Sequence, residues 1–408
     1  MASLAADAVR TGAPLIPRTV RSLPTTFSAA RAGNSIQSHR TMPPGFSATV
    51  GHLETFVLPE RLSTSPSDKA LAKAMVDAWR RHGILQIAMS PSQQRIYAQA
   101  NAASREFFGK TPTQKQACVN ESSYAGYVAS GEEITGGIAD YSEIFTVTKD
   151  LLPNDPRVME KWPCHGPCPW PDKQMKDPMA NYMADMGSSG DKLLRLVELG
   201  LDVPRGSLIK YTQDGWHHMR VLRFPASHRT NGEGKAGRGI GSHTDYGLLV
   251  IASQDEVGGL FVRPPRQGET FANWRQGAAG LKEDEAGWMY VPPTPGVFTA
   301  FPGDMMQYMT NSFLQSTPHK VGLNVRERFA FAYFHEPNFR AVVKPLPGYN
   351  GAQEPADDCL ITQSKSFMMD VENVYPIELR HTGHVVTPFL HISVLEEPDQ
   401  MSATSSSK

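Results

Sequence analysis

Two histidines and an aspartate have the residue types and spacing of a metal site. His243 and Asp245 flank Thr244 just before the apolar run 248–251, so in an extended chain both side chains point to the same side. His319, on a distant segment, is the best candidate for a third ligand. Two imidazoles and one carboxylate leave coordination positions open for substrate and dioxygen, which is typical of non-haem iron(II) sites. We therefore predict that His243, Asp245 and His319 bind Fe(II) and are the catalytic metal ligands.

A His-x-Asp triplet alone is weak evidence, because a chain with 13 histidines contains such triplets by chance. Arg328 follows His319 on a segment expected to form a neighbouring strand. A buried arginine offers a planar fork that donates two charge-assisted hydrogen bonds to a carboxylate. This suits the distal carboxylate of 2-oxoglutarate, whose other end would chelate the iron. The alternative interpretation of Arg328 is a surface or ion-paired strand residue.

The surrounding elements predict an α+β fold with a double-stranded β-helix (jelly-roll) core and flanking α-helices. A helical pattern from Ser67 ends at Gly83, and Ser90-Pro91 has the composition of a helix start. Further segments complete the prediction: a strand at 84–87, a helix at 191–199, a surface loop at 226–239, and strands at 221–224, 248–252, 260–262, 297–301 and 328–334.

Composition and charge limit which partners are possible, and the pattern along the chain predicts its domain organisation. A net charge of −1 with 20% charged residues gives no basic field for nucleic acid, and no apolar run is long enough for a membrane helix. We predict a disordered N-terminal extension at 1–50, one oxygenase domain with an N-terminal helical layer at 51–395, and a disordered tail at 396–408. Four cysteines are too few for a disulfide framework and favour a reducing compartment, so we expect a cytoplasmic protein. We also expect a monomer. The alternative is a mitochondrial protein, because the arginines of the extension, among small and hydroxylated residues, are typical of a mitochondrial presequence.

Several long stretches resemble one known family. They are 125–133, 162–167, 214–225, 239–250, 317–321, 326–330 and 333–338. With these residues the sequence resembles the ethylene-forming enzymes, a branch of the isopenicillin-N-synthase-like 2-oxoglutarate oxygenases, from about residue 51 to about residue 380. The resemblance implies an Fe(II) enzyme that converts 2-oxoglutarate and O2 to ethylene and CO2 and is stimulated by L-arginine. It also implies a parallel C5 hydroxylation of L-arginine that gives succinate, CO2, guanidine and pyrroline-5-carboxylate, with ascorbate supporting activity.

The resemblance assigns the pocket residue by residue. The residues implied to bind 2-oxoglutarate are Arg328, Arg220, Leu222, Val250, Leu260, Phe301, Ala332 and Phe334. Those implied to bind L-arginine are Glu133, which would face its guanidinium, and Thr135, Arg220, Tyr246, Asn373 and Tyr375. Each apolar member of the first set can equally be read as ordinary core.

Two departures from the bacterial pattern bear on the second substrate. Asn373 stands where that pattern has an arginine near the substrate, and Phe331 replaces a smaller cysteine. Ala330, by contrast, matches the ethylene-forming branch at a position where most of the wider superfamily has serine. A plain 2-oxoglutarate-dependent hydroxylase or desaturase of another small molecule, with little or no ethylene, therefore remains the main alternative. A zinc hydrolase and a non-enzymatic jelly-roll binding protein are the others.

Overall fold

The computed structural model describes residues 42–120, 124–162, 164–269, 279–349 and 361–362. Two β-sheets form the core of this part of the chain. The five-stranded sheet has the order β1 (Thr49–Val50), β12 (Met289–Tyr290), β11 (Leu260–Val262), β14 (His319–Gly322) and β9 (Arg238–His243). The eight-stranded sheet has the order β2 (Thr55–Phe56), β3 (Leu85–Ala88), β13 (Val297–Pro302), β10 (Leu249–Gln254), β15 (Arg328–His335), β8 (His218–Phe224), β7 (Glu143–Val147) and β4 (Gly126–Val128).

The remaining elements are helices and two short hairpins. The helices are α1 (Pro66–His82), α2 (Pro91–Phe108), α3 (Pro112–Gln116), α4 (Pro156–Met159), α5 (Lys173–Gly200), α6 (Ile209–Thr212) and α7 (Asp304–Met309). The two-stranded sheets pair β5 (Ile134–Thr135) with β6 (Ile138–Ala139), and β16 (Val342–Val343) with β17 (Ile361–Thr362). Among the described residues, no helix is both long and apolar enough to span a bilayer.

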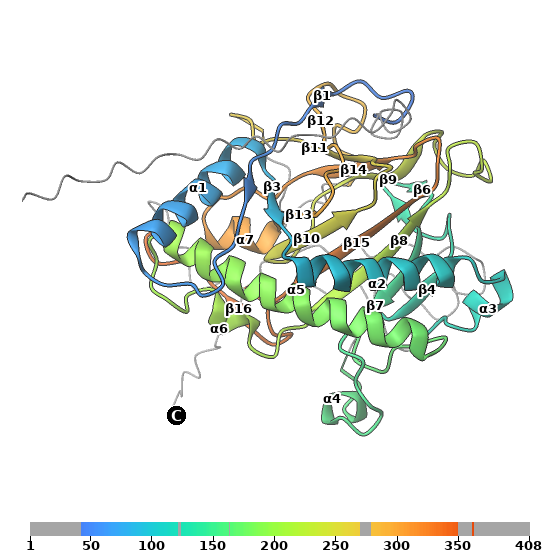
Figure 1. Cartoon of the computed structure of the whole chain (residues 1–408), viewed down its shortest axis with the longest axis horizontal. Coiled ribbons are helices and arrows are strands. Elements are labelled where there is room, and N and C mark those ends of the chain that lie inside the picture. Colours follow the sequence, from blue (N-terminus) through green and yellow to red (C-terminus); the bar gives the residue numbers. More distant parts are fainter. Residues whose placement is uncertain (1–41, 121–123, 163, 270–278, 350–360, 363–408) are drawn as a thin grey trace, which may run out of the picture. The chain divides into compact units, whose positions relative to one another are not determined.

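The long helix α5 packs against both α1 and α2, and α2 and α5 contact the eight-stranded sheet through β15 (Figure 1). The predicted α+β jelly-roll with flanking helices is confirmed. The predicted cap at Gly83 and the predicted helix start at Ser90-Pro91 are confirmed, and α1 begins at Pro66, one residue before the predicted Ser67. Ser65 caps α1, Gly83 adopts the left-handed conformation after it with φ of 73°, and Ser90 forms a capping box with Gln93.

The helix predicted at 191–199 is far longer in the structure, where α5 runs from Lys173 to Gly200. Pro178 and the sequence Gly187-Ser-Ser-Gly190 suggest a break, but all of them lie within the helix. The glycine at 190 has a packing reason: a Cβ there would lie 2.4 Å from a ring atom of His335 on β15. Close approach of helix and sheet therefore overrides the local helix propensity.

Two boundaries also differ from the sequence prediction. The fold already includes residues before 51, because β1 pairs with β12 and Phe46 stacks on Phe261 with ring centroids 4.8 Å apart. The loop predicted at 226–239 is shorter, because β9 begins at Arg238. The predicted tail at 396–408 lies outside the described residues.

Candidate metal centre and active-site pocket

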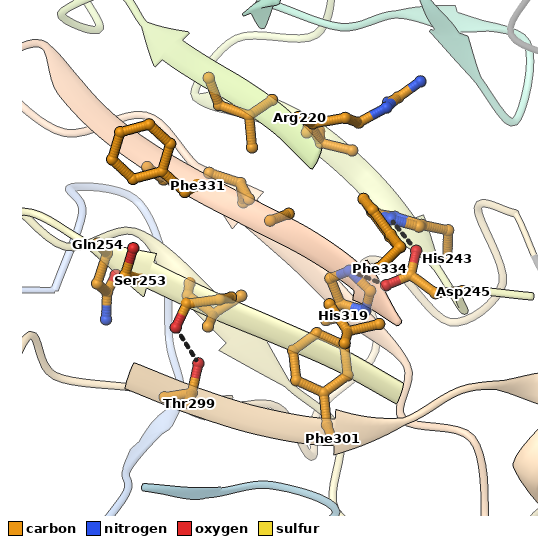
Figure 2. A pocket seen from close by; sticks show the side chains of 18 of the residues that line it. Arg220, His243, Asp245, Ser253, Gln254, Thr299, Phe301, His319, Phe331 and Phe334 are labelled. Atoms are coloured by element: carbon orange, nitrogen blue, oxygen red, sulfur yellow. Dashed lines mark hydrogen bonds and ion pairs between the residues drawn. The ribbon is translucent and has the colours of Figure 1, made fainter. Parts of the chain in front are cut away.

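The structure brings the three predicted metal ligands together at one end of a pocket (Figure 2). His243 is the last residue of β9 and His319 the first of β14, and the two are direct partners in the antiparallel pair. Asp245 follows in the loop after β9. Its carboxylate oxygens lie 3.6 Å from Nε2 of His243 and 3.5 Å from Nε2 of His319. Strand pairing thus converts a large sequence separation into one compact donor set.

Backbone carbonyls fix the orientation of both imidazoles. Nδ1 of His243 lies 2.9 Å from the carbonyl oxygen of Gly241, and Nδ1 of His319 lies 3.1 Å from that of Thr317. If each Nδ1 donates its proton, each Nε2 keeps its lone pair toward Asp245. Burial lowers the pKa of His243 to about 4, so its ring is neutral at physiological pH, as a metal ligand must be.

Helix α7 anchors the loop that carries Asp245. The backbone N–H of Asp304 donates to the carbonyl oxygen of Asp245 at 2.7 Å, and that of Met305 donates to Tyr246 at 2.9 Å. Gly303 permits this contact, since a Cβ there would lie 2.8 Å from the Asp245 carbonyl oxygen. The start of α7 therefore holds the carboxylate ligand in place through the main chain.

The donor set fits a divalent iron ion. Ligand atoms that are each about 2.1 Å from one ion lie roughly 3 Å apart when they occupy one face of its coordination sphere. All three donor atoms here lie within 4.8 Å of one another. His243, Asp245 and His319 would therefore hold the ion after small side-chain adjustments, with the opposite face left to ligands from the cavity.

The pocket lies between the two sheets and has a volume of about 180 Å³. Its wall includes all the apolar residues predicted from the resemblance: Leu222, Val250, Leu260, Phe301, Ala332 and Phe334. Val250, Leu260 and Phe301 belong to a small buried cluster of their own, separate from the main core under the helices. The apolar surface excludes water from the space beside the metal ligands.

Arg328 lines the same pocket and is 4% exposed. It forms no ion pair with any described residue, and its Nε atom has no hydrogen-bond partner. Burial lowers its pKa, although even a lowered arginine stays charged at neutral pH. Arg328 is thus a buried residue of β15 whose charge is attracted by Asp255 but that makes no ion pair with a described residue. A buried guanidinium with an unused donor is suited to a carboxylate ligand.

Glu133 and Arg220 both line the pocket, but they contact each other rather than empty space. Nη1 and Nη2 of Arg220 donate to the two carboxylate oxygens of Glu133 at 3.0 and 2.8 Å, and Nη2 also donates to the hydroxyl of Tyr124 at 2.9 Å. The role implied for Glu133, facing the guanidinium of bound L-arginine, stays a prediction. In the structure an internal guanidinium already occupies this carboxylate.

The other residues implied for L-arginine have different outcomes. Thr135 and Tyr246 line the pocket. Thr135 is buried, and its hydroxyl donates to Asp140, which is itself paired with Arg238 of β9. Asn373 and Tyr375 lie outside the described residues.

The prediction missed several residues of this pocket. They are Tyr124, Trp216, His218, Phe224, Ser253, Gln254, Thr299 and Glu336. One signal in the sequence was available: Gly136-Gly137 between Ile-Thr and Ile-Ala is typical of a two-residue hairpin turn, and these glycines have φ of 58° and 80°. That hairpin, β5–β6, directly follows Glu133 and carries Thr135.

Family models match both halves of the described region. Residues 57–173 match the model described as non-haem dioxygenase in morphine synthesis N-terminal, and residues 215–337 match the 2OG-Fe(II) oxygenase superfamily. The fold is similar to that of a full-length Neurospora crassa protein crystallised with alpha-KG and thymine, with a TM-score of 0.63 at 19% identity, covering 79% of this chain and 97% of that one. The region that matches the 2OG-Fe(II) oxygenase superfamily, residues 215–337, contains His243, Asp245, His319 and Arg328.

Two relatives are informative at the sequence level. A 2-oxoglutarate-dependent ethylene/succinate-forming enzyme from Ralstonia nicotianae is 51% identical over 298 residues, which is 72% of this chain and 85% of the relative. The homoarginine-6-hydroxylase 2-ODD-C23.1 of Arabidopsis thaliana is 30% identical over 254 residues, which is 60% of this chain and 69% of that protein. The chain therefore belongs to the 2-oxoglutarate- and iron(II)-dependent oxygenases and, within them, to the family of the ethylene/succinate-forming enzymes.

Proposed function

We propose that this oxygenase converts 2-oxoglutarate and O2 to ethylene and CO2, and that L-arginine stimulates the reaction. In a parallel reaction L-arginine is hydroxylated at C5, which gives succinate, CO2, guanidine and pyrroline-5-carboxylate. The likeness to the Ralstonia nicotianae enzyme, named for ethylene and succinate formation, supports both product classes. Ascorbate is expected to support activity by keeping the iron reduced.

The observation that carries the L-arginine proposal is the pair of Glu133 with Arg220. Glu133 accepts two hydrogen bonds from a guanidinium at 2.8 and 3.0 Å inside the pocket, so its position and orientation already match a guanidinium fork. A guanidino substrate has the same donor geometry as Arg220. Similarity to a homoarginine-6-hydroxylase, whose named substrate is also a guanidino amino acid, supports this class of ligand.

The chain's own residues divide the work along the pocket. His243, Asp245 and His319 would hold the iron, which when bound supplies the activation of dioxygen and the oxidative decarboxylation of 2-oxoglutarate. Arg328 binds the distal carboxylate of the co-substrate, because it is a buried cation in the pocket wall whose Nε has no hydrogen-bond partner among the described residues. The apolar wall, including Val250 and Phe301, keeps water away from the reacting carbons.

Headspace gas chromatography tests the proposal directly. The purified chain is supplied with iron(II), ascorbate and 2-oxoglutarate, with and without L-arginine, and succinate is assayed in the same vials. Ethylene that depends on L-arginine is the expected result. The His319→Ala variant serves as the matched blank, because it removes one metal ligand from an otherwise intact pocket.

Hydroxylation of a guanidino amino acid with little ethylene is the second candidate. The similarity to the Arabidopsis thaliana hydroxylase favours it, and Phe331 adds bulk to the pocket wall where the bacterial pattern has a smaller residue. Succinate formed in proportion to L-arginine or homoarginine, without ethylene, would establish this function instead.

A further inference from the structure

Arg328 is held by one neutral side chain. Its Nη2 donates to Oε1 of Gln254 at 3.1 Å, and this is the only hydrogen bond of the guanidinium to a described residue. The ring of Phe224 packs against the guanidinium at 5.0 Å. Asp255 is the next residue after Gln254, but its carboxylate accepts from the backbone N–H groups of Val257 and Phe329 and from Arg105. Asp255 therefore attracts the charge of Arg328, but its hydrogen bonds go to these other groups and not to the guanidinium of Arg328.

A second hydrogen bond fixes the amide of Gln254. Its Nε2 donates to the carbonyl oxygen of Val291 at 3.2 Å, which leaves Oε1 facing Arg328. Gln254 is the last residue of β10, and its partner on β15 is Ala330, whose methyl group offers no hydrogen bond. Figure 2 shows Ser253 and Gln254 at the end of the pocket away from the triad. The Gln254 amide is thus a fixed part of the pocket wall, and its oxygen accepts the hydrogen bond that orients the Arg328 guanidinium.

We propose that Gln254 is a positioning residue for the 2-oxoglutarate site: it orients the Arg328 fork through one neutral hydrogen bond while leaving its charge for the distal carboxylate. The amide matters because a carboxylate at the same place would neutralise Arg328 and compete with the ligand. An apolar side chain would leave the guanidinium free to rotate. This inference rests on the proposed role of 2-oxoglutarate as co-substrate, but not on ethylene or L-arginine.

The test measures binding of 2-oxoglutarate by calorimetry to the full chain loaded with Mn(II), which occupies the site without turnover. Gln254→Glu has nearly the shape of glutamine and should weaken binding roughly ten- to hundred-fold, the value of a charge-assisted hydrogen bond. Gln254→Met, which loses orientation only, should weaken it roughly three- to ten-fold. Gln99→Glu, on the exposed surface of α2, adds the same charge away from the pocket and should change nothing.

A second ligand separates positioning from general damage to the pocket. 2-Oxopentanoate has the chain length and the chelating end of 2-oxoglutarate but lacks the distal carboxylate. It should bind the wild type weakly, and Gln254→Glu should weaken it no further. An equal loss for both ligands, or wild-type affinity of Gln254→Glu for 2-oxoglutarate, would overturn the inference. Failure of the wild-type chain to bind 2-oxoglutarate would overturn the co-substrate proposal as well, whereas absence of ethylene alone would not affect either.

Discussion

The carboxylate of Glu133 and the guanidinium of Arg220 form a two-pronged ion pair inside the pocket, with side chains that are 6% and 17% exposed. The pair joins the segment before the β5–β6 hairpin to strand β8. Because Glu133 is already matched with a guanidinium, an incoming guanidino ligand must share this carboxylate or displace Arg220. If L-arginine binds at Glu133 as proposed, its guanidinium would therefore compete with, or share the carboxylate with, a chemically equivalent group.

Glu133→Gln should abolish the effect of L-arginine. The amide keeps the size of the side chain but removes the charge that a guanidinium requires, and we expect L-arginine affinity to fall roughly ten- to hundred-fold. Calorimetric titration of the Mn(II)-loaded variant with L-arginine measures this. Glu132→Gln is the matched control, because the neighbouring carboxylate accepts a hydrogen bond from the backbone of Ala129 and does not line the pocket.

Glu133→Gln also leaves Arg220 without the only carboxylate that pairs with it among the described residues. An unpaired buried charge costs about 3 to 5 kcal/mol, so unfolding by urea must be measured alongside binding. A variant that stays folded and is still stimulated by L-arginine would disprove the guanidinium assignment.

Alanine at His243, Asp245 or His319 should remove the metal. Each substitution leaves two ligands on one ion, and we expect loss of the bound metal and of every product. Metal content after gel filtration, together with the rise in melting temperature on adding Mn(II), checks this. His228→Ala, at an exposed histidine, should keep both properties. Turnover by His243→Ala in rigorously iron-free buffer would contradict the site.

Arg328→Ala should chiefly raise the requirement for 2-oxoglutarate. It removes the charged partner proposed for the distal carboxylate, and a rise in KM of roughly a hundred-fold or more follows from the loss of two charge-assisted hydrogen bonds. Steady-state kinetics at saturating L-arginine separates KM from kcat. An unchanged KM with a lowered kcat would show that the carboxylate binds elsewhere.

The buried rings of His217 and His218 should each make the metal-free protein less stable in acid. Burial lowers the pKa of both to about 3, whereas the unfolded rings take up protons below about 6.5. At these two sites the unfolded state binds more protons, so their contribution to stability is fully present above about pH 6.5 and is lost as pH drops toward 3, whereas the raised pKa values of Asp140, about 6, and Asp304, about 7, give contributions of opposite sign. Urea unfolding across this range measures the slope. His218→Phe should reduce the slope, and an identical slope in that variant would refute the explanation.

A chain that starts at residue 51 should be less stable than one that starts at residue 42. The shorter chain loses β1, the hydrogen bond from Thr49 N to Trp288 O at 3.2 Å, and the stacking of Phe46 on Phe261. We expect a fall of several degrees in melting temperature from the lost apolar burial. Differential scanning calorimetry of the two chains compares them directly. Equal melting temperatures would mean that residues 42–50 contribute nothing to stability.

Local sequence rules predicted the elements with local causes. The caps at Ser65, Gly83 and Ser90 depend on neighbouring residues only, so the ends of α1 and α2 could be predicted. Helix α5 could not, because Gly190 is explained by His335, a residue far away in the sequence. The hairpin at Gly136-Gly137 had a readable signal that the prediction did not use.

The same distinction applies to the site. The triad could be predicted from residue type and spacing, although Asp245 lies in the loop after β9 and His319 joins the site through the pairing of β14 with β9. The pairing of Glu133 with Arg220 could not, since it depends on how the segment before β5 lies against β8. The contact of Gln254 with Arg328 likewise requires the register in which Gln254 faces Ala330, two residues from Arg328 on β15.

The two anchor points of the pocket belong to different sheets. His243 and His319 lie on β9 and β14 of the five-stranded sheet, whereas Arg328 begins β15 of the eight-stranded sheet. A dicarboxylate attached at both ends would therefore cross-link the halves of the jelly-roll. The co-substrate would then be a structural component as well as a reactant. Each time 2-oxoglutarate is consumed, the enzyme would lose this link between the two sheets, and their relative motion would increase.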